Sequence, residues 1–190
     1  MKENLIREPQ AVQRFDNHFQ LEGEKVFYSE KKYSDLQKLY LDQAAAAAKD
    51  EIAYKMADNI CMEKRDKGLY WGFTYLQPGD VAGECNFTRG YFYVDECHEF
   101  YFCFEGCGYL IFWDGEDDYF VEKMFQGSVH WVPSKYARRI VNTGEQVLAV
   151  GICEGFHLDA DYLRIEKSGF PLRIFKENGE VKIVESPVNK

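Results

Sequence analysis

The fold is decided by residues 98–115, which read HEFYFCFEGCGYLIFWDG. Residues 98–105 are rich in aromatic side chains, which favours a β-strand. Two glycines close that run, and a second apolar run covers residues 109–113 before the turn signal Asp114-Gly115. The stretch therefore predicts two consecutive β-strands.

The chain continues in the same way on both sides of this stretch. Short apolar or aromatic runs end at Gly, Pro or Asp residues, and aromatic residues make up 16% of the chain, which favours β-structure. Further strands are predicted over residues 69–77, 119–124, 128–132, 139–142 and 147–153. Many short strands with such turns are typical of a sandwich or a barrel, so we expect an all-β fold.

The N-terminal part is expected to differ from the rest. Ser34 is followed three residues later by Gln37, the pattern of a helix-capping box, and five consecutive alanines come next, so we predict a helix over 34–49. Residues 52–57 alternate and predict a short strand, with a continuing helix as the alternative. We expect one domain over residues 1–190, with an N-terminal arm and helix in 1–50, a β-barrel in 51–165 and a C-terminal extension in 166–190.

Composition and charge narrow the class of protein. With 190 residues, 46% of them hydrophobic and 29% charged, the chain is neither disordered nor collagen-like. Its net charge of -9 and its lack of a basic run make duplex nucleic acid and anionic membranes poor partners. No signal-peptide pattern is visible in residues 1–20, so we expect a cytoplasmic protein. A small phosphorylated ligand stays compatible because it needs only a few local cations.

Cysteine and histidine usage bears on metal sites. Six cysteines occur without a CxxC pair, and several lie inside aromatic strand patterns. In a chain with no secretory signal we expect reduced, buried thiols rather than disulfides, with zinc binding as a weaker alternative. The chain has four histidines, His18, His98, His130 and His157. Their scarcity limits the number of imidazole-based sites.

Three segments of the sequence carry candidate binding or catalytic residues. Thr88-Arg89-Gly90 offers a hydroxyl, a guanidinium and an unhindered backbone, which together can bind a phosphate; a plain turn or β-bulge is the alternative. Glu99 lies in an otherwise apolar strand and suits a general base if it points into a barrel, or is a solvated residue if it points outward. Lys135, Arg138 and Arg139 predict a positive patch that recognises an anion, with a charged loop as the alternative.

Further motifs follow one another along the chain. They are ECNFTRG at 84–90, EGCG at 105–108, GSVHWVP at 127–133, YARRIVNTG at 136–144 and Asp161-Tyr162. In order and spacing the sequence resembles the cupin-type glucose-6-phosphate isomerase family known from archaea, over about residues 15–190. The resemblance implies a cupin fold, a double-stranded β-helix or jelly-roll barrel, usually paired as a homodimer. It also implies the interconversion of glucose 6-phosphate and fructose 6-phosphate.

The resemblance implies roles for single residues. Thr88, Arg89 and Gly90 fall on the family's Thr-Lys-Gly phosphate site, with Arg in place of Lys. Glu99 falls on the glutamate that contacts metal and substrate and is the favoured proton shuttle. The polar residues implied to face the substrate are Tyr101, Thr74, Tyr54 and Tyr162.

The sequence departs from the family at its metal site. The family holds a divalent metal through a His-x-His pair, the glutamate and a later histidine, whereas Tyr91, Tyr93 and Arg138 stand at the three histidine positions here. A guanidinium has no lone pair to give, and tyrosine binds metal only as a phenolate. We therefore predict that no metal cofactor is bound there, with a site relocated to His98 and His130 as the alternative.

The substitutions also bear on function. Arg138 is expected to place its charge where the metal would lie and to pair with Glu99, while Tyr91 and Tyr93 donate hydrogen bonds to a substrate oxygen. The same ion pair would weaken Glu99 as a base. The candidates are an aldose–ketose isomerase of sugar phosphates, a sugar-phosphate binding protein that has lost the chemistry, and a cupin that acts on another anionic sugar.

Overall fold

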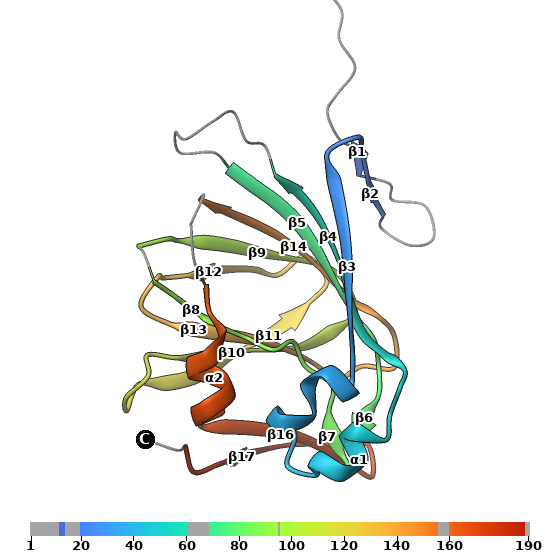
Figure 1. Cartoon of the computed structure of the whole chain (residues 1–190), viewed down its shortest axis with the longest axis vertical. Coiled ribbons are helices and arrows are strands. Elements are labelled where there is room, and N and C mark those ends of the chain that lie inside the picture. Colours follow the sequence, from blue (N-terminus) through green and yellow to red (C-terminus); the bar gives the residue numbers. More distant parts are fainter. Residues whose placement is uncertain (1–11, 14–19, 61–68, 95, 156–159, 189–190) are drawn as a thin grey trace, which may run out of the picture.

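Two β-layers face each other in the computed structural model and enclose the interior of a barrel (Figure 1). The structure describes residues 12–13, 20–60, 69–94, 96–155 and 160–188. One layer is an antiparallel six-stranded sheet in the order β12-β9-β14-β5-β4-β3. Its strands are β3 (Val26–Lys32), β4 (Ile52–Ile60), β5 (Leu69–Leu76), β9 (Glu99–Glu105), β12 (Val129–Val132) and β14 (Leu148–Gly155).

The facing layer consists of two smaller sheets. One has the order β11-β10-β13 and the other the order β17-β16-β7-β6. Isolated bridges join Phe87 to Val141 and Tyr91 to Arg138, so the segment between β7 and β8 runs beside β13. The strands of this layer are β6 (Asp80–Val81), β7 (Glu84–Cys85), β10 (Cys107–Trp113), β11 (Tyr119–Phe125), β13 (Ala137–Asn142), β16 (Leu172–Glu177) and β17 (Glu180–Glu185).

Short elements complete the described chain. β1 (Val12–Gln13) pairs with β2 (Leu21–Glu22), and β8 (Phe92–Tyr93) pairs with β15 (Ala160–Asp161). The helical elements are the 3-10 helix η1 (Ser34–Leu39) and the α-helices α1 (Gln43–Ala47) and α2 (Tyr162–Ser168). No helix in this described part of the chain has the length and apolarity that crossing a bilayer requires.

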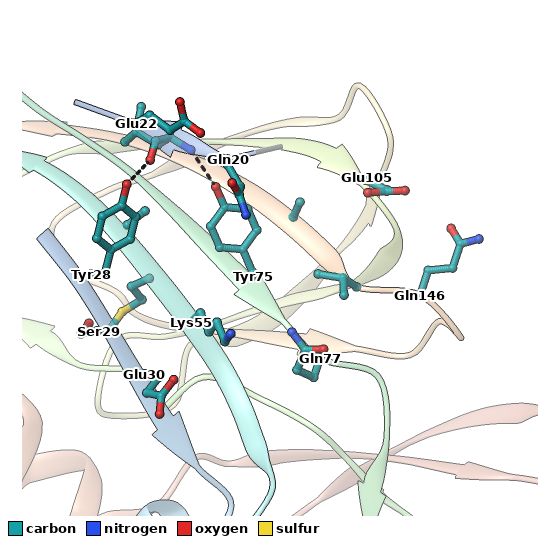
Figure 2. Close-up of a pocket in the computed structure, with 15 residues that line it drawn as sticks. Gln20, Glu22, Tyr28, Ser29, Glu30, Lys55, Tyr75, Gln77, Glu105 and Gln146 are labelled. Carbon is teal, nitrogen blue, oxygen red and sulfur yellow. Dashed lines mark hydrogen bonds between the residues drawn. The ribbon is translucent and has the colours of Figure 1, made fainter. Parts of the chain in front are cut away.

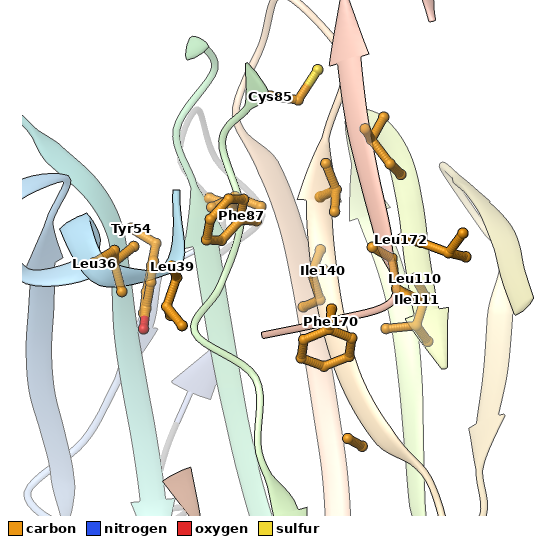
Figure 3. Close-up of a cluster of buried hydrophobic side chains, with 14 of the residues drawn as sticks. Leu36, Leu39, Tyr54, Cys85, Phe87, Leu110, Ile111, Ile140, Phe170 and Leu172 are labelled. Carbon is orange, nitrogen blue, oxygen red and sulfur yellow. The ribbon is translucent and has the colours of Figure 1, made fainter. Parts of the chain in front are cut away.

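Apolar side chains fill the space between the layers. Strands turn every second side chain inward, and η1 adds Leu36 and Leu39 to the same cluster. Burying a side chain such as Leu110 or Phe112 completely contributes about 1.5–3 kcal/mol. The residues labelled in Figure 3 are Leu36, Leu39, Tyr54, Cys85, Phe87, Leu110, Ile111, Ile140, Phe170 and Leu172.

The predicted all-β barrel of the cupin type is confirmed. Every strand predicted from residue 69 to 153 is present, with ends that differ by one or two residues, and the strand predicted over 52–57 is present as β4. β10 starts earlier than predicted because Gly108 allows a close approach to its neighbour β13. A Cβ atom at Gly108 would lie 2.0 Å from the Val141 carbonyl oxygen.

The predicted continuous helix over 34–49 is wrong. η1 ends at Leu39 and α1 begins at Gln43. The residue before η1 is Tyr33, which makes no side-chain capping bond, so Ser34 does not start a capped helix. The capping residue is Asp42, whose carboxylate accepts a hydrogen bond of 2.9 Å from the Ala45 backbone amide.

Tertiary packing at Tyr40 explains the interruption. The Tyr40 ring stacks on Phe87 with a centroid separation of 4.2 Å, and its hydroxyl donates a 3.1 Å hydrogen bond to Asn86 Oδ1. Tyr40 has extended backbone angles, which end η1. Burial of this ring and its hydrogen bond outweigh the helix propensity of the alanines that follow.

Segments assigned outside the barrel also contribute strands to its sheets. β3 lies within residues 1–50 and pairs along its length with β4. β16 and β17 lie within 166–190, where they pair with each other, and β16 also pairs with β7. The sheets therefore extend beyond residues 51–165.

The described cysteines are free thiols, as expected. Cys85, Cys97 and Cys103 are buried, Cys153 is half-buried and Cys107 is exposed. Burial raises the pKa values of the Cys85 and Cys103 thiols to about 11, so these two groups stay protonated near neutral pH. The remaining cysteine, Cys61, lies outside the described residues, as do His18 and His157.

The start of α1 can be tested by a pair of substitutions. Asp42→Ala removes the capping acceptor, so we expect the free energy of unfolding to fall by about 1 kcal/mol. Ser34→Ala removes no capping bond and should change it by less than about 0.5 kcal/mol. Urea denaturation followed by intrinsic fluorescence measures both values. Equal losses in the two variants would contradict the assigned helix start.

Candidate functional site

A cavity of about 270 Å³ lies between the two layers of the barrel. Alternate residues of each strand face it, because successive side chains of a strand point to opposite sides. β4, β5, β13 and β14 each supply two or three of these residues, and β9 supplies Tyr101. The lining residues are Lys31, Tyr54, Met56, Asp58, Tyr70, Thr74, Thr88, Arg89, Gly90, Tyr91, Tyr101, Arg138, Ile140, Ile152, Glu154 and Tyr162.

Most of the predicted site residues meet at this cavity. Those that line it are Tyr54, Thr74, Thr88, Arg89, Gly90, Tyr91, Tyr101, Arg138 and Tyr162. Two predicted residues, Glu99 and Tyr93, are absent from the lining. Glu99 is 0% exposed, and it is hydrogen-bonded to Tyr91 and Arg138, which do line the cavity. The residues predicted to bind a phosphate and those predicted to act on the sugar therefore share one chamber.

The Thr88-Arg89-Gly90 loop is held rigidly against β13. The Thr88 hydroxyl accepts a 3.0 Å hydrogen bond from the Ile140 amide, and buried Arg139 donates a 2.9 Å bond from Nη2 to the Arg89 carbonyl. Gly90 has φ of +76°, and a Cβ atom there would lie 2.7 Å from the Arg138 carbonyl oxygen. Only glycine fits this backbone without a shift.

The Arg89 side chain is oriented by two neighbours on α2. Its guanidinium lies 3.6 Å from the centre of the Tyr162 ring, and Nη1 lies 3.3 Å from Glu166 Oε1. Both members of the ion pair are partly exposed, so the contact is weak and an incoming anion can replace it. Lys31 of β3 lines the same cavity and adds a second cation.

The predicted positive patch of Lys135, Arg138 and Arg139 does not form. Lys135 is exposed and lies 3.5 Å from Asp118, whereas Arg138 faces the cavity. Arg139 follows Arg138 on β13 and therefore points to the other side, where its guanidinium lies 4.3 Å from the centroids of two aromatic rings. Burial lowers the pKa of Arg139 to about 9.

A buried ion pair joins the two layers next to the cavity. Arg138 of β13 donates from Nε to Glu99 Oε2 at 3.1 Å and from Nη2 to Glu99 Oε1, and its Nη1 donates to the Tyr91 carbonyl at 3.2 Å. The two side chains are 1% and 0% exposed. The guanidinium carbon lies 3.7 Å and 3.8 Å from the ring centres of Tyr91 and Tyr93. The expected contact between Arg138 and Glu99 is therefore present in the structure.

A second carboxyl group, Glu154, lies opposite Glu99. The two residues are direct partners in the pairing of β14 with β9, and the Tyr93 hydroxyl lies within hydrogen-bond distance of both carboxyl groups. Burial, and then the nearby negative charge of Glu99, raise the pKa of Glu154 to about 9. Glu154 is therefore protonated near neutral pH.

The residues at the family's metal positions do not fit a divalent metal. Both Glu99 oxygens accept hydrogen bonds from Arg138, whose positive charge occupies the position next to them. Burial raises the pKa of the Tyr91 hydroxyl well above its ordinary value, so the phenolate that a metal requires is disfavoured. A metal ion in this position would be repelled by the positive charge of Arg138. The residues around it would also lack free lone pairs with which to coordinate the ion.

Neither of the two described histidines lines the inner cavity. His130 Nε2 lies 2.8 Å from the Ser128 hydroxyl and its Nδ1 lies 2.6 Å from Glu122. His98 is half exposed and lies 3.8 Å from Glu96. Within the described ranges, no three His, Cys, Asp or Glu side chains form a group that could hold a metal.

A larger cavity, of about 840 Å³, lies on the other face of the six-stranded sheet (Figure 2). Lys55 and Tyr75 line it, whereas their strand neighbours Tyr54 and Thr74 line the inner cavity. The Tyr28 hydroxyl donates to the Leu21 carbonyl at 2.8 Å across its wall. None of the predicted site residues lines this larger cavity, so the smaller inner cavity is the candidate active site.

Comparison with known proteins shows which family the chain belongs to. The family model described as Glucose-6-phosphate isomerase (GPI) matches residues 30–187. The chain belongs to the glucose-6-phosphate isomerase family. The glucose-6-phosphate isomerase of Pyrococcus furiosus is 31% identical, over 88% of this chain and 89% of the relative. That of Thermococcus kodakarensis is 32% identical, over 83% and 85%.

Among solved structures, an oxalate decarboxylase mutant of Bacillus subtilis aligns with a TM-score of 0.45 and 15% identity, over 57% of this chain and 28% of that chain. The glucose-6-phosphate isomerase family match runs from within β3 to beyond β17. It therefore includes every residue that lines the inner cavity, from Lys31 to Tyr162.

Some cavity residues were not predicted from the sequence. Glu154 and Asp58 are carboxyl groups on its wall, and the Tyr70 hydroxyl donates a hydrogen bond to Asp58. Burial raises the pKa of Asp58. A usable signal existed for Glu154, because it is a carboxylate at the end of an apolar strand, as Glu99 is at the start of one. Lys31 carried no signal.

The buried ion pair makes a strong prediction about stability. Arg138→Met leaves the Glu99 carboxylate buried without a partner, so we expect a loss of about 3–5 kcal/mol in the free energy of unfolding. The double variant Glu99→Leu with Arg138→Met removes both charges and should recover most of that loss. Urea denaturation measures both. A loss below about 1 kcal/mol in the single variant would mean that the pair is not desolvated.

The Glu154 carboxyl predicts a pH-dependent stability. Its pKa is about 9 in the folded protein, against about 4.3 in an unfolded chain. Between these values the folded state keeps a proton that the unfolded state has lost, so this group lowers stability as pH rises, by at most ~1.4 kcal/mol per pH unit. Glu154→Gln should therefore be more stable than the parent at pH 8, with a difference that shrinks toward pH 5. Urea midpoints across this range provide the measurement, and a constant difference would contradict the shift.

Proposed function

We propose that this family member interconverts glucose 6-phosphate and fructose 6-phosphate in the inner cavity. One observation carries the proposal: apart from Glu99, the residues expected for the phosphate and those expected for the sugar line the same chamber of the barrel. Its volume of about 270 Å³ is near the lower end for small-ligand pockets, in keeping with a phosphorylated monosaccharide.

The phosphate is proposed to bind at the Thr88-Arg89-Gly90 loop. A guanidinium there can form two parallel hydrogen bonds to phosphate oxygens, and the rigid loop keeps this donor in place. Lys31 of β3 lines the same cavity and adds a second positive charge for an anion, in a chain whose net charge is -9. Tyr162 stacks on Arg89 and fixes the direction of the guanidinium.

The sugar is proposed to lie toward Arg138, Tyr101, Tyr54 and Thr74. Isomerisation between an aldose and a ketose passes through an enediolate, whose negative charge needs oriented donors or cations. Arg138 provides a permanent positive charge on the cavity wall, and the Tyr101 hydroxyl lines the cavity with it. The expectation that Tyr91 and Tyr93 donate to a substrate oxygen is wrong, because both hydroxyls donate to Glu99. We propose that these groups serve the reaction without a bound metal.

A second candidate is a sugar-phosphate binding protein without catalysis. The observation that favours it is the pairing of Glu99 with Arg138, because both carboxylate oxygens already accept hydrogen bonds from the guanidinium and Glu99 does not line the cavity. The phosphate loop supports both candidates equally. The homodimer and the cytoplasmic location stay predictions.

A turnover assay with both sugar phosphates tests the function. We expect isomerisation in the presence of a chelator at the same rate as with added divalent metal. Thermal shift with fructose 6-phosphate, against fructose as the control, reports binding separately. Stabilisation without turnover under any metal condition would select the binding protein, and no response to either compound would contradict the assignment to sugar phosphates.

The phosphate loop has its own test. Arg89→Met removes the guanidinium, and we expect KM for either sugar phosphate to rise about 10- to 100-fold because a hydrogen bond to a charged group is lost. Glu166→Gln is the matched control on α2, since it releases Arg89 from its ion pair and should leave KM equal or lower. Steady-state kinetics measure both. An unchanged KM in Arg89→Met would place the phosphate elsewhere.

A further inference from the structure

Arg139 is a buried cation on the side of β13 that points away from the inner cavity. The residue is 3% exposed, and its guanidinium lies 4.3 Å from the ring centres of both Phe87 and Phe170, which are labelled in Figure 3. Both rings belong to the apolar cluster between the layers. Arginine is rarely buried so completely unless a carboxylate pairs with it, so its burial in this cluster needs an explanation.

Within the described part of the chain, no carboxylate pairs directly with Arg139. The carboxylate that acts on it through the interior is that of Glu84. Glu84 already accepts a 2.7 Å hydrogen bond from Arg173 Nη1 and a 2.8 Å bond from the Leu41 amide. The Nε of Arg139 is buried and has no hydrogen-bond partner among the described residues. Glu84 and Arg173 neutralise each other, so the charge of Arg139 is left without a counter-charge.

The polar contact that Arg139 does make leads to the loop proposed to bind the phosphate. Its Nη2 donates a 2.9 Å hydrogen bond to the Arg89 carbonyl. That carbonyl shares a peptide group with the Gly90 N–H, and Arg89 and Gly90 both line the inner cavity. A cation at the carbonyl oxygen polarises the peptide and makes its N–H a stronger donor. The charge of Arg139 therefore reaches the loop through this peptide and through the low-dielectric interior.

A phosphoryl group bound at the loop would supply the missing counter-charge. A charge that is buried without a partner destabilises a folded protein, and a nearby anion reduces that penalty. A phosphate monoester carries nearly two negative charges at neutral pH, whereas a free sugar carries none. The buried cation therefore favours a phosphorylated ligand over the same sugar without its phosphate.

We infer that Arg139 is a positioning residue of the phosphate loop, and that the phosphoryl group of the substrate balances its buried charge. This inference rests on the proposed function, because it takes the Thr88-Arg89-Gly90 loop as the phosphate site. Arg139 does not line the cavity, so it acts through the Arg89 carbonyl and through its electric field. Its role is to select phosphorylated sugars.

A role in binding and a role in folding predict opposite results when the charge is removed. If Arg139 only supports the fold, its loss lowers the urea midpoint of the ligand-free protein and leaves the affinity for the sugar phosphate unchanged. If its charge serves binding, the loss relieves an uncompensated burial. The ligand-free protein then keeps or raises its urea midpoint, while its affinity for the sugar phosphate falls.

The experiment compares the parent protein with Arg139→Met, which keeps an unbranched side chain between the two rings and removes the charge. In calorimetric titration with fructose 6-phosphate, we expect the dissociation constant to rise about 10- to 100-fold. KM should rise with it, while kcat changes less than about threefold. Arg139→Lys keeps the charge and should stay within about fivefold of the parent affinity. Lys135→Met removes an exposed cation and is the matched control for net charge, with parental affinity expected.

An unchanged dissociation constant in Arg139→Met, beside a parent protein that binds fructose 6-phosphate, would overturn the inference and leave the proposed function standing. Equal losses of affinity in Arg139→Met and Arg139→Lys would also overturn it, because the charge would then have no effect. A parent protein that does not bind fructose 6-phosphate would contradict the proposed function and the inference together. If Arg139→Met does not fold, Arg139→Gln removes the same charge, keeps an amide donor and is measured in its place.

Discussion

The buried pair of Glu99 and Arg138 is the interaction on which the site depends. It connects β9 of one layer to β13 of the other, and both charges are withdrawn from water. Desolvation makes either charge costly without its partner, so the two residues have to be present together. The pair also positions two neighbouring side chains, because the rings of Tyr91 and Tyr93 pack against the Arg138 guanidinium.

The same pair also determines the charge at the position where the family resemblance places a metal. A permanent cation stands where the resemblance places a metal, and it is a donor that needs no ligands of its own. Burial and the negative charge of Glu99 raise the pKa of Glu154, its partner across the strand pair, to about 9. The cavity is lined by the cations Lys31, Arg89 and Arg138.

Features that depend on residues close together in the sequence were predictable, whereas features that depend on distant residues were not. Strands were predictable because alternation and turn residues are local, and β9 and β10 were read from one stretch. The helix over 34–49 failed because Tyr40 is buried against Phe87, a contact between residues far apart in sequence. The positive patch failed because adjacent residues of β13 face opposite sides. Glu154 was missed at the end of an apolar strand.

Residue patterns alone were enough to predict the all-β barrel, the glucose-6-phosphate isomerase family and, as a prediction still, which residues stand at the family's metal positions. These depend on periodicity and on motifs within short segments. Tertiary contacts were needed to show that Glu99 is enclosed and that Glu154 and Lys31 line the cavity. The physical reason is that desolvation and hydrogen bonding depend on which strands pair and in which register, and those partners are distant in the chain.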